Sequence, residues 1–249
     1  MPILKNGPTK IHYEEAGSGY PLLVIPGGGL NGTIAGLATH AFNPLDEFSD
    51  KHHVAALDLR NANGGQSEGP LDIERTWDAF TDDQLALADH LGFDRFMVMG
   101  FCIGGPLIWN LLKRAGDRIA GAVLVHPSGY TSSHPNIFYN NNMSGWAPGF
   151  CEQRPEITMD MISKFLNNMY TKRSDFVLTV DRDFVRSCET PVLVLPDDIP
   201  AHPYATAMET ALLAPNAQVS LYPWKENDRK IRLAVNHIRT FLQANRPEG

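Results

Sequence analysis

Cysteine is scarce in this chain of 249 residues, and the cysteines that are present form no closely spaced pair. Cys102, Cys151 and Cys188 lie far apart, and no C-x-x-C motif occurs. This spacing predicts neither a disulfide framework nor a cysteine-based zinc site. We therefore expect no bound metal and no cofactor.

Runs of basic residues are also missing, and the formal net charge is −7 at pH 7. A chain without a basic patch is not expected to bind nucleic acid or an anionic membrane surface. No apolar run is long enough to span a bilayer, and the first residues, MPILKNGPTK, lack the apolar segment of a signal peptide. These absences predict a cytoplasmic protein. We expect a monomer or homodimer that acts on a small-molecule substrate, and the sequence does not decide between the two states.

The residues that are present follow an alternating pattern of short apolar runs and helical periodicity. We expect strands within residues 20–29, 52–60, 96–100, 119–127, 190–196 and 217–224, and helices within residues 76–93, 106–117, 204–215 and 232–243. Near-continuous apolar strands that alternate with helices predict an α/β fold, with a mainly parallel sheet covered by helices on both faces.

The alternation stops between the fourth and fifth of these expected strands, over residues 128–189. We expect residues 128–150 to be loop and residues 155–170 and 174–188 to be helical. Ligands bind at the carboxyl ends of the strands in open α/β sheets. We therefore predict a single domain over residues 1–249, with residues 128–189 inserted as a cap over those ends.

The stretch VMGFCIGGPL, residues 98–107, predicts a strand, a sharp turn and a helix. Its G-x-C-x-G spacing is that of a nucleophile elbow, with Cys102 at the nucleophile position. Gly100 and Gly104 permit the tight turn, and the start of the following helix favours a thiolate at Cys102. The alternative interpretation is a buried structural cysteine.

Four motifs in order, VIPGGG, LDLRNANGGQS, GFCIGG and PVLVLPDD, resemble the α/β-hydrolase superfamily over nearly the whole chain. The second is similar to the D-x-R-x-x-G-x-S turn of its proline-iminopeptidase-like members. The resemblance implies the α/β-hydrolase fold. Dienelactone hydrolases in this superfamily also use a cysteine nucleophile. Fold alone does not set the chemistry.

The resemblance also implies an oxyanion hole and a triad acid. The backbone N–H groups of Gly28 and Ile103 match the oxyanion donors, with Gly29 close behind as a substrate contact. The acid is expected after the strand PVLVL, where Asp197 and Asp198 are both candidates and we favour Asp198.

The base is where the sequence departs most from the superfamily. Histidine is expected after the last strand, but Trp224 and Lys225 occupy that segment, and His237 lies inside the final helix. His202, in the loop that follows the acid, is our candidate for the base. His126 is the alternative, and it is otherwise expected to line the substrate pocket. Trp146, in the cap, is a further candidate for substrate contact.

Together these residues predict a hydrolase of a small or medium carboxylic ester or lactone, with a triad of Cys102, His202 and Asp198. Near alternatives on the same scaffold are a C–C bond hydrolase, a thioesterase and an acyltransferase. The rivals from other classes are a non-catalytic receptor for a small ligand and a redox-sensing thiol.

Overall fold

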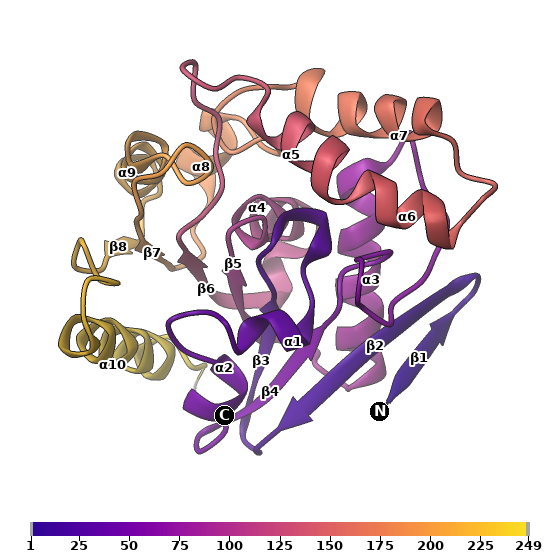
Figure 1. Ribbon diagram of the computed structural model, residues 1–249. Coiled ribbons are helices and arrows are strands. Elements are labelled where there is room, and N and C mark those ends of the chain that lie inside the picture. The colour runs from indigo at the N-terminus through magenta and orange to yellow at the C-terminus, as the bar shows by residue number, and fades with distance from the viewer. Residues whose placement is uncertain (1, 248–249) are drawn as a thin grey trace.

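Eight strands form one sheet in the computed structural model, which describes residues 2–247 (Figure 1). The strand order is β1-β2-β4-β3-β5-β6-β7-β8. The strands are β1 (Ile3–Asn6), β2 (Thr9–Ala16), β3 (Tyr20–Ile25), β4 (His52–Leu57), β5 (Phe96–Phe101), β6 (Ile119–Val125), β7 (Val192–Leu195) and β8 (Ala217–Val219). The pairs β1·β2 and β2·β4 are antiparallel, and the remaining pairs are parallel.

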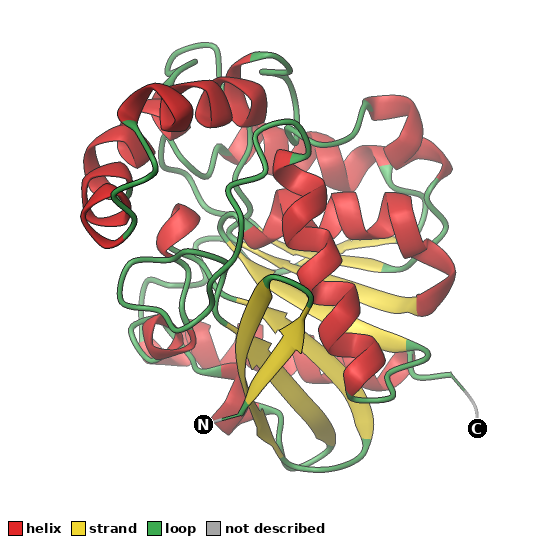
Figure 2. Cartoon of the chain, turned by 90° about the vertical axis from the view of Figure 1, so that its right-hand side faces the viewer, coloured by secondary structure: helices red, strands yellow, loops and turns green. Residues whose placement is uncertain are grey.

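Helices cover both faces of this sheet, as the sequence predicts (Figure 2). Alternate residues of β3 show why. Leu23 and Ile25 join a core with the helices α3 (Thr76–His90), α4 (Gly104–Ala115) and α9 (Tyr204–Leu213). Leu22 and Val24 join a second core with α1 (Ile34–Leu37), α2 (Pro44–Glu47) and α10 (Asp228–Ala244). Strands buried on both faces explain the continuous apolar runs of the sequence.

Residues 128–189, which we name the cap segment, contain four helices and a π-helical turn. These are α5 (Ile137–Gly145), α6 (Ala147–Gln153), α7 (Met159–Leu166), the π-helical turn η3 (Asn167–Thr171) and α8 (Arg182–Ser187). Helices α5, α6 and α7 lie together at one end of the sheet (Figure 1). The domain boundaries themselves stay a prediction.

Two expectations for the cap segment are wrong in part. Residues 128–136 are loop, as expected, but residues 137–150 hold α5 and the first part of α6. The partly buried Phe138 and Tyr139 pack α5 on the core, and Phe150 of α6 is buried in it. Of residues 174–188, only Arg182–Ser187 is helical, and Phe176 and Leu178 have positive φ angles of 46° and 70°. A positive φ in a bulky residue interrupts a helix, although the composition favours one.

Candidate active site

Cys102 lies on a sharp turn between β5 and α4. Its φ angle is 53°, a left-handed conformation that is uncommon for a residue with a side chain. The flanking glycines are required by close approach: a Cβ on Gly100 would lie 2.7 Å from the Gly104 carbonyl oxygen, and one on Gly104 would lie 3.1 Å from that of Ile25. The turn lifts the Cys102 side chain above the sheet and next to the N-terminus of α4.

The surroundings of Cys102 favour the thiolate. Burial raises the pKa of its thiol, but hydrogen-bonding and charge interactions with His202 outweigh burial and lower the pKa to about 7. The Ser128 hydroxyl, 3.3 Å from Sγ, and the Gly28 backbone N–H act in the same direction. In contrast, burial raises the pKa of the Cys188 thiol. The candidate nucleophile is therefore electrostatically distinct from a packing cysteine.

His202 lies in the loop after β7, where an isolated antiparallel bridge fixes the backbone. The bridge pairs Ile199 with His202, whose N–H donates to the Ile199 carbonyl at 2.9 Å. On the ring, Nδ1 is 3.1 Å from Oδ2 of Asp197, and Nε2 is buried without a partner in ordinary hydrogen-bond geometry. Catalytic hydrogen bonds are often long or misaligned before substrate binds. Burial lowers the pKa of His202, but Cys102 and Asp197 outweigh burial and raise it.

Asp197, and not Asp198, is the carboxylate that contacts this histidine. The preference for Asp198 is a correction: its side chain is exposed, whereas Asp197 is buried and forms the bond to His202. The two adjacent side chains differ in environment, since Asp197 faces the protein interior and Asp198 faces solvent. Burial raises the pKa of Asp197, but Lys225 and His202 outweigh burial and lower it.

Trp224 and Lys225, which replace the expected terminal histidine, both contact the acid loop. The Trp224 indole N–H donates to the Pro196 carbonyl at 2.9 Å, and the ring is 1 % exposed. Nζ of Lys225 lies 2.6 Å from Oδ2 of Asp197, the same oxygen that His202 contacts. The loop after β8 therefore packs against the acid loop and binds it through two side-chain contacts. His237, on α10, contacts Gln218 at 3.1 Å.

The glycine turn after β3 lies beside the nucleophile. A Cβ on Gly27 would be 3.2 Å from Cβ of Cys102, and Gly28 has a φ of 110° that directs its N–H toward the sulfur. Ile103 is the N-cap residue of α4, directly after the nucleophile. Gly29 faces the cap segment, since a Cβ there would lie 3.4 Å from Oδ1 of Asn142. This arrangement suits an oxyanion hole.

His126, the alternative base, packs against His202 from the end of β6. Its ring stacks on Trp224 with centroids 5.9 Å apart, and lies 4.8 Å from the ring of His202 and 5.5 Å from that of His40. Burial and the charges of His202 and Lys225 hold its pKa well below the usual range. His126 is thus a neutral ring behind His202, and no hydrogen bond links it to Cys102 among the described residues.

Trp146 packs the cap rather than presenting its ring to a ligand. It is 2 % exposed, donates from its indole N–H to the Asn61 carbonyl at 2.8 Å and stacks on Phe150 with centroids 4.9 Å apart. The expectation of a substrate contact at Trp146 is corrected by these contacts, because a fully packed ring has no face left for substrate.

Sequence reasoning missed three residues of this site. Ser128 follows β6 in the stretch HPSG, and its hydroxyl contacts the Cys102 sulfur. Lys225 lies in the loop after β8 and binds Asp197. Tyr170 lies in the π-helical turn η3. The burial of Tyr170 and the negative charge of Cys102 raise the pKa of the Tyr170 hydroxyl. A π-helical turn has no distinct sequence signal, so the sequence does not predict that Tyr170 belongs to the site.

A known protein family has the fold of this chain. Residues 20–229 match the model of the alpha/beta hydrolase fold family, which covers most of the chain. The protein belongs to the alpha/beta hydrolase fold family.

Curated relatives of different chemistry are similar to part of the chain. Epoxide hydrolase 3 of Xenopus tropicalis is 26 % identical over 145 residues, which cover 55 % of this chain and 38 % of the relative. The 2-hydroxymuconate semialdehyde hydrolase of Pseudomonas sp. (strain CF600) is 28 % identical over 146 residues, 59 % of this chain and 48 % of the relative. The matched stretch thus spans less than half of either relative.

Solved structures share the fold over nearly the full chain. A meta-cleavage product hydrolase from Pseudomonas fluorescens IP01 has a TM-score of 0.71 at 17 % identity, and covers 96 % of both chains. Naproxen esterase from Bacillus subtilis has a TM-score of 0.68 at 16 % identity, over 96 % of this chain and 90 % of its own.

Within residues 2–247, no helix is long and apolar enough to cross a membrane.

Proposed function

We propose that this protein hydrolyses small or medium carboxylic esters or lactones through an acyl-cysteine intermediate. Cys102 is the nucleophile, His202 the base and acid, and Asp197 the carboxylate that orients His202. The proposal rests on two opposite pKa changes. The pKa of the Cys102 thiol is lowered to about 7, and the pKa of the His202 imidazole is raised. Such a shift favours a thiolate–imidazolium pair.

In the acylation step, the thiolate sulfur attacks the carbonyl carbon of the ester. A C–S bond forms and the carbonyl π electrons move to the oxygen, which the N–H groups of Gly28 and Ile103 stabilise. When the carbonyl re-forms, the C–O bond to the alkoxide breaks. The imidazolium of His202 gives its proton to the departing oxygen, so that an alcohol leaves and an acyl-cysteine remains.

Water completes the cycle. Neutral His202 removes a proton from water as its oxygen attacks the thioester carbon, and the same two N–H groups stabilise the second oxyanion. Collapse of this intermediate breaks the C–S bond and releases the carboxylic acid and the thiolate. Asp197 remains ionised throughout and holds Nδ1 of His202, which leaves Nε2 for proton transfer.

The proposal is tested by intact-protein mass spectrometry and steady-state turnover with p-nitrophenyl acetate. The wild-type protein should carry a transient acetyl group at Cys102, and Cys102→Ala should lower kcat by about 10³-fold or more. Cys151→Ala is the matched control, because Cys151 is also partly exposed but its sulfur contacts Met159 of the cap segment at 3.7 Å. Unchanged turnover by Cys102→Ala would contradict covalent catalysis.

A second candidate is hydrolysis of an activated C–C bond. It is favoured by the similarity to the 2-hydroxymuconate semialdehyde hydrolase of Pseudomonas sp. (strain CF600). In that case a carbanion, rather than an alkoxide, would leave and accept the proton. Turnover of a vinylogous 2-oxo acid with no hydrolysis of simple esters would favour this candidate over the first.

A further inference from the structure

Tyr170 has a buried hydroxyl group that no acceptor satisfies. The residue is 4 % exposed, and its Oη atom has no hydrogen-bond partner in ordinary geometry within residues 2–247. A buried hydroxyl without a partner lowers stability, and native proteins rarely retain one without a reason. The Tyr170 hydroxyl lies in the electrostatic neighbourhood of the Cys102 sulfur, which points to a partner that arrives with the substrate.

The ring of Tyr170 is held in place by aromatic neighbours. Tyr170 lies in η3, a single π-helical turn that continues α7, and such turns occur frequently at functional sites. Trp77 meets the ring edge-on with centroids 5.6 Å apart, and Phe138 stacks on it at 5.5 Å. The Trp77 indole also donates to the Met169 carbonyl at 3.0 Å. These contacts fix the direction of the hydroxyl.

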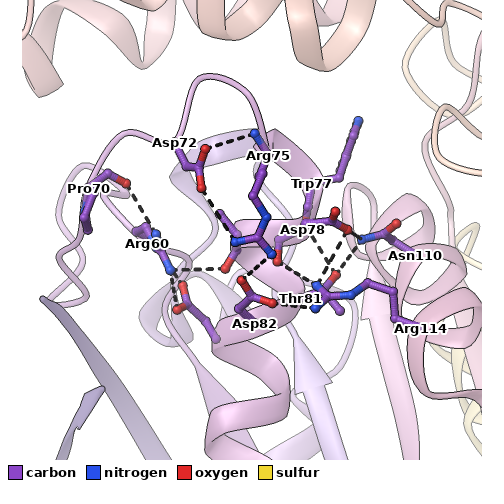
Figure 3. Close-up of polar contacts among 12 residues, drawn as sticks. Arg60, Pro70, Asp72, Arg75, Trp77, Asp78, Thr81, Asp82, Asn110 and Arg114 are labelled. Atoms are coloured by element: carbon purple, nitrogen blue, oxygen red, sulfur yellow. Dashed lines mark hydrogen bonds and ion pairs between the residues drawn. The ribbon is translucent and has the colours of Figure 1, made fainter. Parts of the chain in front are cut away.

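Trp77 belongs to helix α3, which ion pairs and hydrogen bonds connect to neighbouring segments. Asp82 on this helix binds Arg75 at 2.9 Å and Arg114 at 2.6 Å, and Asp78 accepts from Asn110 at 3.0 Å. The Trp77 ring points away from this network (Figure 3). Helix α3 therefore contacts the cap segment through Trp77, which packs on Tyr170 and binds the Met169 carbonyl.

Asn142 leaves the tyrosine proton free. Its Oδ1 accepts from the Leu30 N–H at 3.3 Å and its Nδ2 donates to the Phe138 carbonyl at 2.7 Å, which holds the amide in place with a second N–H that can face Tyr170. Asn142 opposes the rise in the pKa of Tyr170, as expected when an N–H group faces the phenol oxygen. Burial and the Cys102 charge still keep the hydroxyl protonated, and therefore a donor.

We propose that the Tyr170 hydroxyl donates a hydrogen bond to an oxygen atom on the carbon next to the scissile carbonyl. The substrate class is then an ester of a 2-oxo or 2-hydroxy carboxylic acid, whose apolar remainder packs on the partly exposed rings of Trp77 and Phe138. The proposal rests on the function proposed for Cys102. In the proposed mechanism the N–H groups of Gly28 and Ile103 serve the carbonyl oxygen and His202 serves the leaving oxygen. The Tyr170 donor is therefore left for an oxygen on the acyl carbon next to the carbonyl.

The test compares two esters that differ at this one carbon, ethyl phenylpyruvate and ethyl 3-phenylpropanoate. Tyr170→Phe keeps the ring and removes only the donor. It should lower kcat/KM for the 2-oxo ester about tenfold, and for the plain ester less than about twofold. Tyr139→Phe is the matched control, because the Tyr139 hydroxyl already contacts the Ser163 hydroxyl at 2.9 Å and should affect neither ester.

Two results would overturn the assignment of Tyr170. An equal loss on both esters would show that the hydroxyl acts on the oxyanion or on packing, and no loss on either ester would show that it contacts no substrate. Failure of the underlying function is separate: Cys102→Ala would then hydrolyse the plain ester as fast as the wild type. Thermal unfolding of Tyr170→Phe checks that the fold is unchanged.

Discussion

The loops after β7 and β8 lie at the same edge of the sheet and contact each other, yet they contribute different things. The loop after β7 supplies both Asp197 and His202, which contact each other 3.1 Å apart. The loop after β8 supplies Trp224, which packs beneath the first loop, and Lys225, which binds Asp197. One loop carries the Asp197–His202 pair, and the other packs against it.

In the proposed mechanism, this difference lets the base change position without a change of fold. A histidine after β8 would need the space that the Trp224 indole fills, and Lys225 already occupies one carboxylate oxygen of Asp197. The short bridge between Ile199 and His202 brings an imidazole back to the same carboxylate from the other side. A thiol with a pKa of about 7 tolerates this arrangement, since it needs less activation than a hydroxyl.

The largest effect on turnover is expected from removing the imidazole of the β7 loop. His202→Ala should lower kcat by about 10²–10⁴-fold, because no group is left to protonate the leaving oxygen or to activate water. His237→Ala, on the outer part of α10, is the control and should leave kcat unchanged. Full activity of His202→Ala would show that the β7 loop supplies no proton-transfer group, and the proposed difference between the two loops would be wrong.

The next effect separates the two neighbouring carboxylates. Asp197→Asn should lower kcat by about 10²-fold or more, since the amide stabilises the imidazolium poorly and can select the wrong tautomer. Asp198→Asn should have little effect, because that side chain is exposed and no bond ties it to His202. Steady-state kinetics of both variants decide the point. The reverse ranking would restore the preference for Asp198 drawn from the sequence.

A smaller effect is expected from the charge of the β8 loop. Lys225→Met should change kcat only a few-fold but destabilise the fold by about 1 kcal/mol at pH 7, or about 2–4 °C in Tm. Lys225 lowers the pKa of Asp197, so its contribution is present above the ordinary carboxylate pKa and is lost as pH falls through the depressed value. The Tm difference between variant and wild type should therefore shrink in acid. A difference that grows in acid would contradict the ion pair.

The smallest effect on turnover is expected at Trp224. Trp224→Phe removes the donor to the Pro196 carbonyl and part of the stacking on His126, and should cost about 1–3 kcal/mol of stability. Turnover per folded molecule should stay near the wild-type value, because the residue touches no reacting atom. Chemical denaturation combined with active-site titration measures both quantities. A loss of kcat as large as that of His202→Ala would show that the indole takes part in catalysis.

The sequence predicted the parallel part of the sheet and the elbow, because buried strands and glycine turns leave strong local patterns. It did not predict the hairpin of β1 and β2, whose strands mix polar and apolar residues. It also made β8 too long, since only Ala217–Val219 pairs with β7.

The structure brings together Cys102, Gly28 and His202, which the sequence proposes as site residues because each lies in a recognisable turn or loop. The choice between Asp197 and Asp198 depends on which way a turn points its side chains, and no pattern encodes that direction. Tyr170 depends on a π-helical turn and on contacts with Trp77, 93 residues earlier in the chain. Such long-range contacts appear only after folding.

The most direct test of the account is the pH dependence of Cys102 alkylation by iodoacetamide, measured in the wild type, His202→Ala and His237→Ala. The wild-type rate should rise with a midpoint near pH 7, the pKa of the Cys102 thiol, and His237→Ala should match it. In His202→Ala the midpoint should move upward toward the ordinary thiol value of 9.0. An unchanged midpoint in His202→Ala would show that the histidine of the acid loop does not activate the nucleophile.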